Sequence, residues 1–282
     1  MARPDSHNSN RQARQGGGPG GKGSRPQPHQ HSVALRTCHA PGDEPITIES
    51  YLKLNEPFRI ERASVNRLKR REINPKEAFT VRDGSGSYVR ASLKELNANG
   101  GLAVPYERME RSPEPTIDIT LACSVLARQR MIFVMQKATE LGVTRIVPLL
   151  TDHSVPAQGL EHERANSWPA QVIRAAKQCR RASLPHVLPP VTLDLFLTSA
   201  IFMSADLRVV LDDRNVPAPS PAESPRRIVL LVGPEGGFSN AERSSLADRA
   251  HSWMLGGRIL RAETAVIVGL TAIQMRWGDF LG

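Results

Sequence analysis

The chain has 282 residues, 40% of them hydrophobic, and 37 Lys and Arg against 28 Asp and Glu give a formal net charge of +9. This excess favours a polyanionic partner, because each phosphate that a basic side chain neutralises releases counterions. The three cysteines, Cys38, Cys123 and Cys179, are far apart and form no CxxC pair, which argues against a disulfide framework or a metal site and favours a reducing compartment. No apolar leader is recognisable and no apolar run approaches the ~20 residues that span a bilayer, so we expect a cytoplasmic protein without a membrane partner.

Composition divides the chain into three parts. Residues 1–45 are rich in Gly, Pro, Gln, His, Ser and Arg and bury too little apolar surface to offset the entropy of ordering, so we expect a disordered low-complexity tail. Residues 46–115 have the pattern of a small β-rich module, and residues 116–282 alternate between strand-like and helix-like stretches. The Pro-rich segment 112–116, SPEPT, marks the joint between these two domains.

In the small module, residues 78–96 predict two strands joined by a DGSG turn. The stretch just before it, 62–77, is strongly basic. Its candidates for RNA contact are Arg62, Arg67, Lys69, Arg70 and Arg71. Such a cluster either grips phosphates or is simply a solvated basic face, and the sequence favours neither reading over the other.

Alternation between strands and helices fills the larger domain. Apolar runs predict strands at 117–126, 144–151, 207–213 and 227–233, with a last strand or turn at 253–260. Helical patterns cover 131–142, 162–181, 239–250 and 263–277. We expect Gly142 to cap the first of these helices, Pro169 to lie in the first turn of the second or to break it, and Ser239 to form a capping box with Glu242. This order predicts an α/β fold with a mostly parallel sheet and helices on both faces.

Two glycine-bearing turns carry the candidate chemistry. In the first, an apolar strand runs into Gly233-Pro234-Glu235-Gly236-Gly237 and then into a capped helix. In open α/β sheets ligands bind at the carboxyl ends of strands, and glycines there let the backbone approach a ligand closely. The segment matches neither GxxxxGK[ST] nor GxGxxG, and an ordinary strand-to-helix turn is the alternative reading.

The second turn is LGGRILRAETA, residues 255–265. Arg258 and Arg261 bracket it and could hold a phosphate or orient a base. Glu263 and Thr264 lie at the start of the last helix, where a carboxylate is favoured by the helix dipole and Thr can cap, so a capping role competes with a role in catalysis.

A third segment, 136–154, contains Lys137 and Glu140 three positions apart on a helix, which indicates an intrahelical ion pair. His153 follows a strand end and could face a site, although a structural role is the commoner one for a single histidine.

Together these motifs resemble one known family. QKATELG, then TDHSV, a QCRR helix end, GPEGGFSNAE and LGGRILRAETA are similar in residue types and order to the RsmE family of the SPOUT superfamily, over about 46–282. The resemblance implies a C-terminal SPOUT domain with a deep trefoil knot and a mostly parallel sheet, a rare exception to the rule against threaded chains. It also implies a PUA-like RNA-binding domain at the N-terminus, a homodimer, and methylation of uridine N3 in 16S ribosomal RNA with S-adenosylmethionine as methyl donor.

The resemblance also assigns the cofactor pocket, which would be lined by Leu231, Gly233, Glu235, Gly236, Gly237, Leu255, Gly256, Ile259, Leu260, Arg261, Thr264 and Ala265. For catalysis, a guanidinium that stabilises the developing uracil oxyanion is expected, with Arg261 as the first candidate and Arg181 as the second. Glu263 is the candidate general base.

The chain departs from the family at several positions: His153 stands for Arg, Lys177 for Glu and Ala262 for Thr, and residues 63–66 replace a His-centred segment. We expect these changes to lie mostly on the RNA side and to leave cofactor binding intact. Two other functions stay open at this point, a SPOUT methyltransferase that acts on another RNA such as transfer RNA, and a catalytically silent RNA-binding protein.

Overall fold

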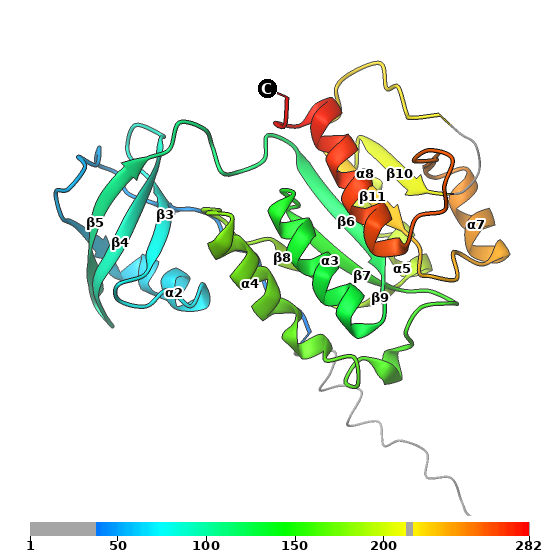
Figure 1. The fold of residues 1–282 in the computed structure, drawn as a ribbon, viewed down its shortest axis with the longest axis horizontal. Helices are drawn as coiled ribbons and strands as arrows, with labels where there is room; N and C mark the ends of the chain where they lie inside the picture. Colours follow the sequence, from blue (N-terminus) through cyan, green and yellow to red (C-terminus); the bar gives the residue numbers. More distant parts are fainter. Residues whose placement is uncertain (1–37, 213–216, 282) are drawn as a thin grey trace, which may run out of the picture.

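A computed structural model describes residues 38–212 and 217–281, which form two sheets with their helices (Figure 1). Residues 1–37 of the expected disordered tail lie outside the described residues. The remainder of that stretch departs from the expectation: Ala40 and Val187 exchange backbone hydrogen bonds of 2.9 and 3.0 Å, and Cys38 is fully buried in the core of the larger domain. Since its backbone groups are paired and its cysteine is packed, 38–45 is part of the fold.

The N-terminal domain contains a five-stranded sheet in the order β1-β3-β4-β5-β2, in which only the β1–β3 pair is parallel. Its elements are β1 (Ile46–Thr47), β2 (Phe58–Glu61), α2 (Arg62–Arg70), β3 (Ala78–Arg82), β4 (Tyr88–Asn97) and β5 (Gly100–Arg108). The predicted hairpin is confirmed, with Val81 opposite Val89. The Asp83 carboxylate holds its turn by accepting hydrogen bonds from Ser85 N and Ser87 N at 3.0 and 3.3 Å.

The C-terminal domain contains a seven-stranded sheet in the order β12-β10-β11-β6-β7-β8, with β9 also paired to β7. Every strand pair in it is parallel, which confirms the expected α/β architecture. Its strands are β6 (Asp118–Ser124), β7 (Arg145–Leu150), β8 (His186–Val187), β9 (Val191–Thr192), β10 (Leu207–Leu211), β11 (Arg227–Val232) and β12 (His251–Trp253). Its helices are α3 (Arg128–Glu140), α4 (Trp168–Gln178), α5 (Leu193–Leu197), α6 (Ala200–Met203), α7 (Asn240–Ala247) and α8 (Ala262–Trp277), with 3-10 turns at Ala157–Gly159 and Ala165–Ser167.

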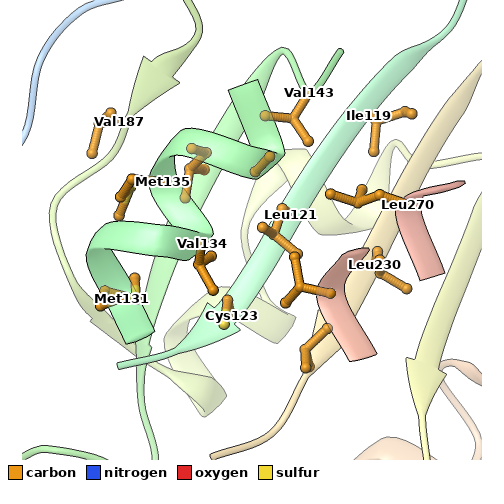
Figure 2. Close-up of a cluster of buried hydrophobic side chains, with 14 of the residues drawn as sticks. Ile119, Leu121, Cys123, Met131, Val134, Met135, Val143, Val187, Leu230 and Leu270 are labelled. Atoms are coloured by element: carbon orange, nitrogen blue, oxygen red, sulfur yellow. The ribbon is translucent and has the colours of Figure 1, made fainter. Parts of the chain in front are cut away.

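Both faces of this sheet are buried. Alternate side chains of β6 point to opposite faces, so Leu121 packs with α3, α4 and α8 while Ala122 packs with α5, α6 and α7. Figure 2 shows the first cluster, where side chains of α3, β6 and α8 meet. Full burial of an aliphatic side chain contributes about 1.5–3 kcal/mol, so the two clusters hold the strand ends in place.

Most of the expected helix ends are confirmed. Ser239 and Glu242 form the capping box that starts α7, Pro169 lies in the first turn of α4, and Gly142 follows the C-cap of α3 with a φ of +80°. Thr264 is different. The N-cap of α8 is Arg261, so Thr264 lies inside the first helical turn, where it caps nothing.

A network of charged groups fastens the two domains together at the turn that follows α4. The Glu114 carboxylate accepts hydrogen bonds from the backbone N–H groups of Ala182 and Ser183, at 2.7 and 2.8 Å, and pairs with Arg181 at 3.1 Å. From the N-terminal sheet, Thr80 donates a hydrogen bond to the carbonyl of Arg180 at 2.8 Å. We call these contacts the domain joint.

Candidate functional site

A cavity of about 600 Å³ opens at the carboxyl ends of three neighbouring parallel strands. Leu211, Val232 and Trp253, the last residues of β10, β11 and β12, all line it. This is the usual position of a ligand in an open α/β sheet, and the volume is that of a small-molecule site. The two glycine-bearing turns, which we call the first turn (233–238) and the second turn (254–261), supply most of the wall.

The first turn is held in shape by its own backbone and by α7. Gly237 has a φ of +70°, which glycine adopts without strain, and its N–H donates to the carbonyl of Pro234 at 2.9 Å. The guanidinium of Arg243 donates to the carbonyl of Phe238 at 3.0 Å and also pairs with Asp212 at the end of β10. The turn is therefore preorganised by contacts within the protein.

The second turn has far fewer contacts of its own. Gly256 has a φ of +90°, and a Cβ added at Gly256 or Gly257 would have no described atom within 4 Å. Ile259 is 94% exposed, and Arg258 and Arg261 are exposed beside it. This wall therefore offers backbone groups, apolar side chains such as Leu255, Ile259 and Leu260, and two guanidiniums that form no ion pair among the described residues.

All but two of the cofactor residues implied by the family resemblance line this cavity. Those that do are Gly233, Glu235, Gly236, Gly237, Leu255, Gly256, Ile259, Leu260, Arg261 and Ala265. Leu231 does not, because it is fully buried among the side chains on the α5–α7 face of the sheet, and Thr264 points into solvent from α8. The first and second turns, which are more than 15 residues apart in the sequence, thus meet in one cavity as expected.

The three catalytic candidates are not brought together. Arg261 lines the cavity, and within the described part of the chain no carboxylate pairs with it. Glu263 lies just behind the wall, 3.8 Å from Arg130, with one carboxylate oxygen buried and without a hydrogen-bond partner. Arg181 is in the wrong place for catalysis. Its side chain is 4% exposed in the domain joint, where it donates to the carbonyl of Val143 at 2.7 Å and pairs with Glu114.

The basic cluster of the N-terminal domain also has to be corrected at one position. The Arg71 side chain is 6% exposed and donates to the backbone carbonyls of Ala182 and Glu44, so it is part of the domain joint and cannot grip a phosphate. Burial lowers the pKa of Arg71, while the charge of Asp43 opposes that effect. Asp43 also pairs with the half-exposed Arg67 and Arg70.

The two remaining members of the cluster, Arg62 and Lys69, are exposed on α2. Together with the partly exposed guanidiniums of Arg67 and Arg70, they keep a basic surface on this helix available to a partner.

His153 lies beside the cavity, although the departures from the family pattern were expected mostly on the RNA side. Its Nδ1 is 3.0 Å from the carbonyl oxygen of Gly237, and its ring packs against Gly236. The departure at His153 therefore bears on the first turn of the cofactor wall. By contrast, Lys177 bonds to Glu77 at 3.0 Å in the domain joint, and the expected Lys137–Glu140 pair is confirmed at 2.8 Å.

Cys123 is fully buried at the end of β6, close to the cavity wall. Burial raises the pKa of this thiol, and the negative charges of Glu235 and Glu263 raise it further. A thiolate is therefore disfavoured, and the residue fills space as a neutral side chain.

Several wall residues were given no role in the sequence analysis: Arg130, Leu211, Asp212, Val232, Phe238, Arg243, Trp253 and Met254. Val232, Phe238, Trp253 and Met254 adjoin the glycine-bearing turns, and proximity along the chain would have found them. Arg130 had no such signal, because it reaches the cavity from the start of α3. Its hydrogen bond to Glu235, and then the charge of that carboxylate, raise the pKa of Arg130.

Residues 38–212 and 217–281 contain no helix whose length and hydropathy would allow it to span a bilayer, and no three of their His, Cys, Asp or Glu side chains gather as metal ligands would.

Comparison with known proteins agrees with this geometry. Residues 112–274 match the family model of an RNA methyltransferase domain. Ribosomal RNA small subunit methyltransferase E of Synechocystis is 33% identical over 213 residues, covering 70% of this chain and 66% of the relative, and that of Rickettsia conorii is 27% identical, covering 79% and 92%. The crystal structure of ribosomal RNA small subunit methyltransferase E from Neisseria gonorrhoeae bound to S-adenosyl methionine has a TM-score of 0.59 and 28% identity, covering 84% of this chain and 99% of that one. The cavity at the strand ends, the motifs that line it and the match over more than half of the chain place this protein in the RNA methyltransferase family, among relatives of the RsmE type.

Proposed function

We propose that the chain transfers a methyl group from S-adenosylmethionine to N3 of a uridine in 16S ribosomal RNA. The observation that carries the proposal is the meeting of the first and second turns in one cavity, which is also lined by Arg261. Relatives named as ribosomal RNA small subunit methyltransferases, and a solved relative with S-adenosyl methionine bound, support the class of substrate and the methyl donor.

The donor set of the cavity suits this cofactor. Glycines in both turns leave backbone N–H and C=O groups open for hydrogen bonds to a nucleoside, and Leu255, Leu260 and Ala265 offer apolar contacts for a purine ring. The carboxylates of Glu235 and Glu263 lie beside the cavity and favour a cationic ligand. When bound, the cofactor would supply an electrophilic methyl group.

The protein's own residues would act on the acceptor base. Uracil N3 carries a proton at neutral pH, so its reaction needs that proton removed and the resulting charge stabilised. Arg261, exposed and without a carboxylate partner among the described residues, would donate hydrogen bonds to the uracil oxygen on which charge develops. Glu263 stays the candidate base, since one of its oxygens has no hydrogen-bond donor in the described structure.

Recognition of RNA is assigned to the N-terminal domain. We propose that this sheet is PUA-like and that Arg62, Arg67, Lys69 and Arg70 of α2 contact phosphates, which the exposure of these side chains supports. Arg62→Ala is expected to weaken binding of many RNA sequences alike and to reduce the salt dependence by about one released ion.

A trefoil knot, a homodimer and a cytoplasmic location complete the proposal. The knot is supported by the strand order, because the chain leaves β11, passes α7 and returns to place β12 beyond β10. The homodimer is supported by partly exposed apolar side chains on the adjacent helices α3 and α8, namely Phe133, Val268 and Met275.

The test is nucleoside analysis, by mass spectrometry, of RNA from cells with and without the gene. Loss of N3-methyluridine from 16S ribosomal RNA, restored by the wild-type gene, is expected. Loss of a methylated nucleoside from transfer RNA instead would identify a different substrate. An unchanged set of nucleosides, with no heat on titration of S-adenosylmethionine into the purified protein, would indicate a silent RNA-binding protein.

A further inference from the structure

Arg130 occupies an electrostatically unfavourable position. It is the third residue of α3, and the N-terminal end of that helix contains no acidic residue. Cations are disfavoured at helix N-termini because the backbone dipole places partial positive charge there. A guanidinium in this position therefore needs compensation from outside the helix.

Two carboxylates provide that compensation: Glu235 lies in the first turn, and Glu263 lies just behind the second turn, at the start of α8. Arg130 Nη1 donates to Glu235 Oε1 of the first turn at 2.5 Å, and its Nε lies 3.8 Å from Glu263 Oε1 at the start of α8, directly after the second turn. Its side chain is 39% exposed, and Arg130 itself lines the cavity. A single guanidinium thus spans the gap between two segments that are 28 positions apart in the sequence.

The second turn depends on such external support. Its glycines have no neighbours within 4 Å of an added Cβ, and Ile259 projects into solvent. The first turn, by contrast, is tied to α7 and β10 through Arg243. Among the described residues, no other basic side chain is ion-paired with both Glu235 and Glu263.

We propose that Arg130 is a positioning residue that joins the two walls of the cavity through Glu235 and Glu263, and thereby sets the affinity for the cofactor. This inference rests on the proposed function, because it takes S-adenosylmethionine as the ligand. Arg130 acts through the two carboxylates, so its effect belongs to binding and is small once the cofactor is saturating. Arginine is suited to this task, because its planar group presents several donors at fixed angles, whereas the ammonium of lysine is a compact point charge.

The experiment measures the dissociation constant of S-adenosylmethionine by calorimetry on the full chain. Arg130→Ala is expected to weaken binding about tenfold. The affinity of Arg130→Lys is expected to lie between those of wild type and Arg130→Ala, because lysine engages one carboxylate well and the other poorly. In a Glu235→Ala/Glu263→Ala background, Arg130→Ala is expected to change the affinity by less than about twofold, since coupled residues are not additive. Turnover of Arg130→Ala at saturating cofactor stays within about threefold of wild type.

Lys137→Ala is the matched control. Lys137 lies on the same helix and is ion-paired with Glu140 at 2.8 Å, but it does not line the cavity, so its removal should leave cofactor affinity unchanged. Thermal unfolding of each variant identifies any loss that is due to misfolding.

An affinity of Arg130→Ala equal to wild type would overturn the proposal, as would the full loss persisting in the background that lacks both carboxylates. A wild-type protein that binds no S-adenosylmethionine would instead refute the proposed function itself.

Discussion

Arginine and glutamate occur both in the domain joint and around the cavity, but the two regions use them in opposite ways. In the joint, Arg181 is almost fully buried and donates to Glu114 and to the carbonyls of Thr139 and Val143. At the cavity, Arg261 is exposed, and no carboxylate in the described structure pairs with it. Buried charges are retained when their hydrogen bonds are satisfied within the protein, whereas unsatisfied charges at a concave surface are available to a ligand.

This contrast separates the first and second candidates for the catalytic arginine, Arg261 and Arg181. Each lies within a family motif, Arg181 in QCRR and Arg261 in LGGRILRAETA. Arg181 and Arg261 differ in the number of hydrogen-bond and ion-pair partners that they have within the protein, and that number depends on how the chain folds.

Glu114→Ala should have the largest effect on stability. It removes the carboxylate that binds Arg181 and two backbone N–H groups, and leaves a buried guanidinium without its counter-ion. We expect a loss of about 3–5 kcal/mol in the free energy of unfolding, measured by urea denaturation. Glu114→Gln, which keeps the size of the side chain, should lose less. A stability equal to wild type for Glu114→Ala would mean that the joint does not hold the domains.

Gly236→Val should affect ligand binding most strongly. A Cβ at this position would lie 3.0 Å from His153 Cβ, so the two extra methyl groups would displace the first turn. We expect the affinity for S-adenosylmethionine to fall roughly a hundredfold, which corresponds to about 2.7 kcal/mol. Adding His153→Gly removes both the Cβ and the ring that the new side chain would meet and should restore part of the affinity. Calorimetry that finds full affinity in Gly236→Val would contradict the placement of this turn in the site.

Arg261→Ala should depress turnover by about tenfold to a hundredfold, because one donor to the developing oxyanion is lost from an exposed position. Cofactor affinity should change by less than about threefold, since the interaction is made in the transition state. Methylation of ribosomal RNA in single-turnover experiments measures the first quantity and calorimetry the second. Arg258→Ala, on the same turn, is the comparison variant. The assignment would be reversed by weaker cofactor binding with normal turnover at saturation.

Lys177→Ala should have the smallest effect, although Lys177 belongs to the same joint as Glu114. Its pair with Glu77 is partly exposed, with side chains 29% and 40% accessible, so water and salt already screen it. We expect a change below about 1 kcal/mol in the free energy of unfolding, smaller still at high salt. A loss as large as that of Glu114→Ala would show that burial does not decide which contacts in the joint matter.

The longer strands and helices of the C-terminal domain, the β3–β4 hairpin and the two turns were predictable from local sequence, whereas α2, β5, α5 and α6 were not predicted. Apolar runs such as 227–233 are long enough to specify buried strands, and the Ser239–Glu242 box is a local signal that needs no tertiary contact to form. Glycines in both turns marked places where the backbone approaches a ligand. The order of these motifs was sufficient to indicate the family.

Only the tertiary structure decided which charged residues serve the fold and which face the ligand. The burial of Arg71 and Arg181, the docking of 38–45 against β8, and the reach of Arg130 from α3 to both walls depend on contacts between segments distant in sequence. Hydropathy and helical periodicity describe the neighbourhood of a residue along the chain. An ion pair depends on the partner that folding brings within about 4 Å, and a local pattern carries no information about that partner.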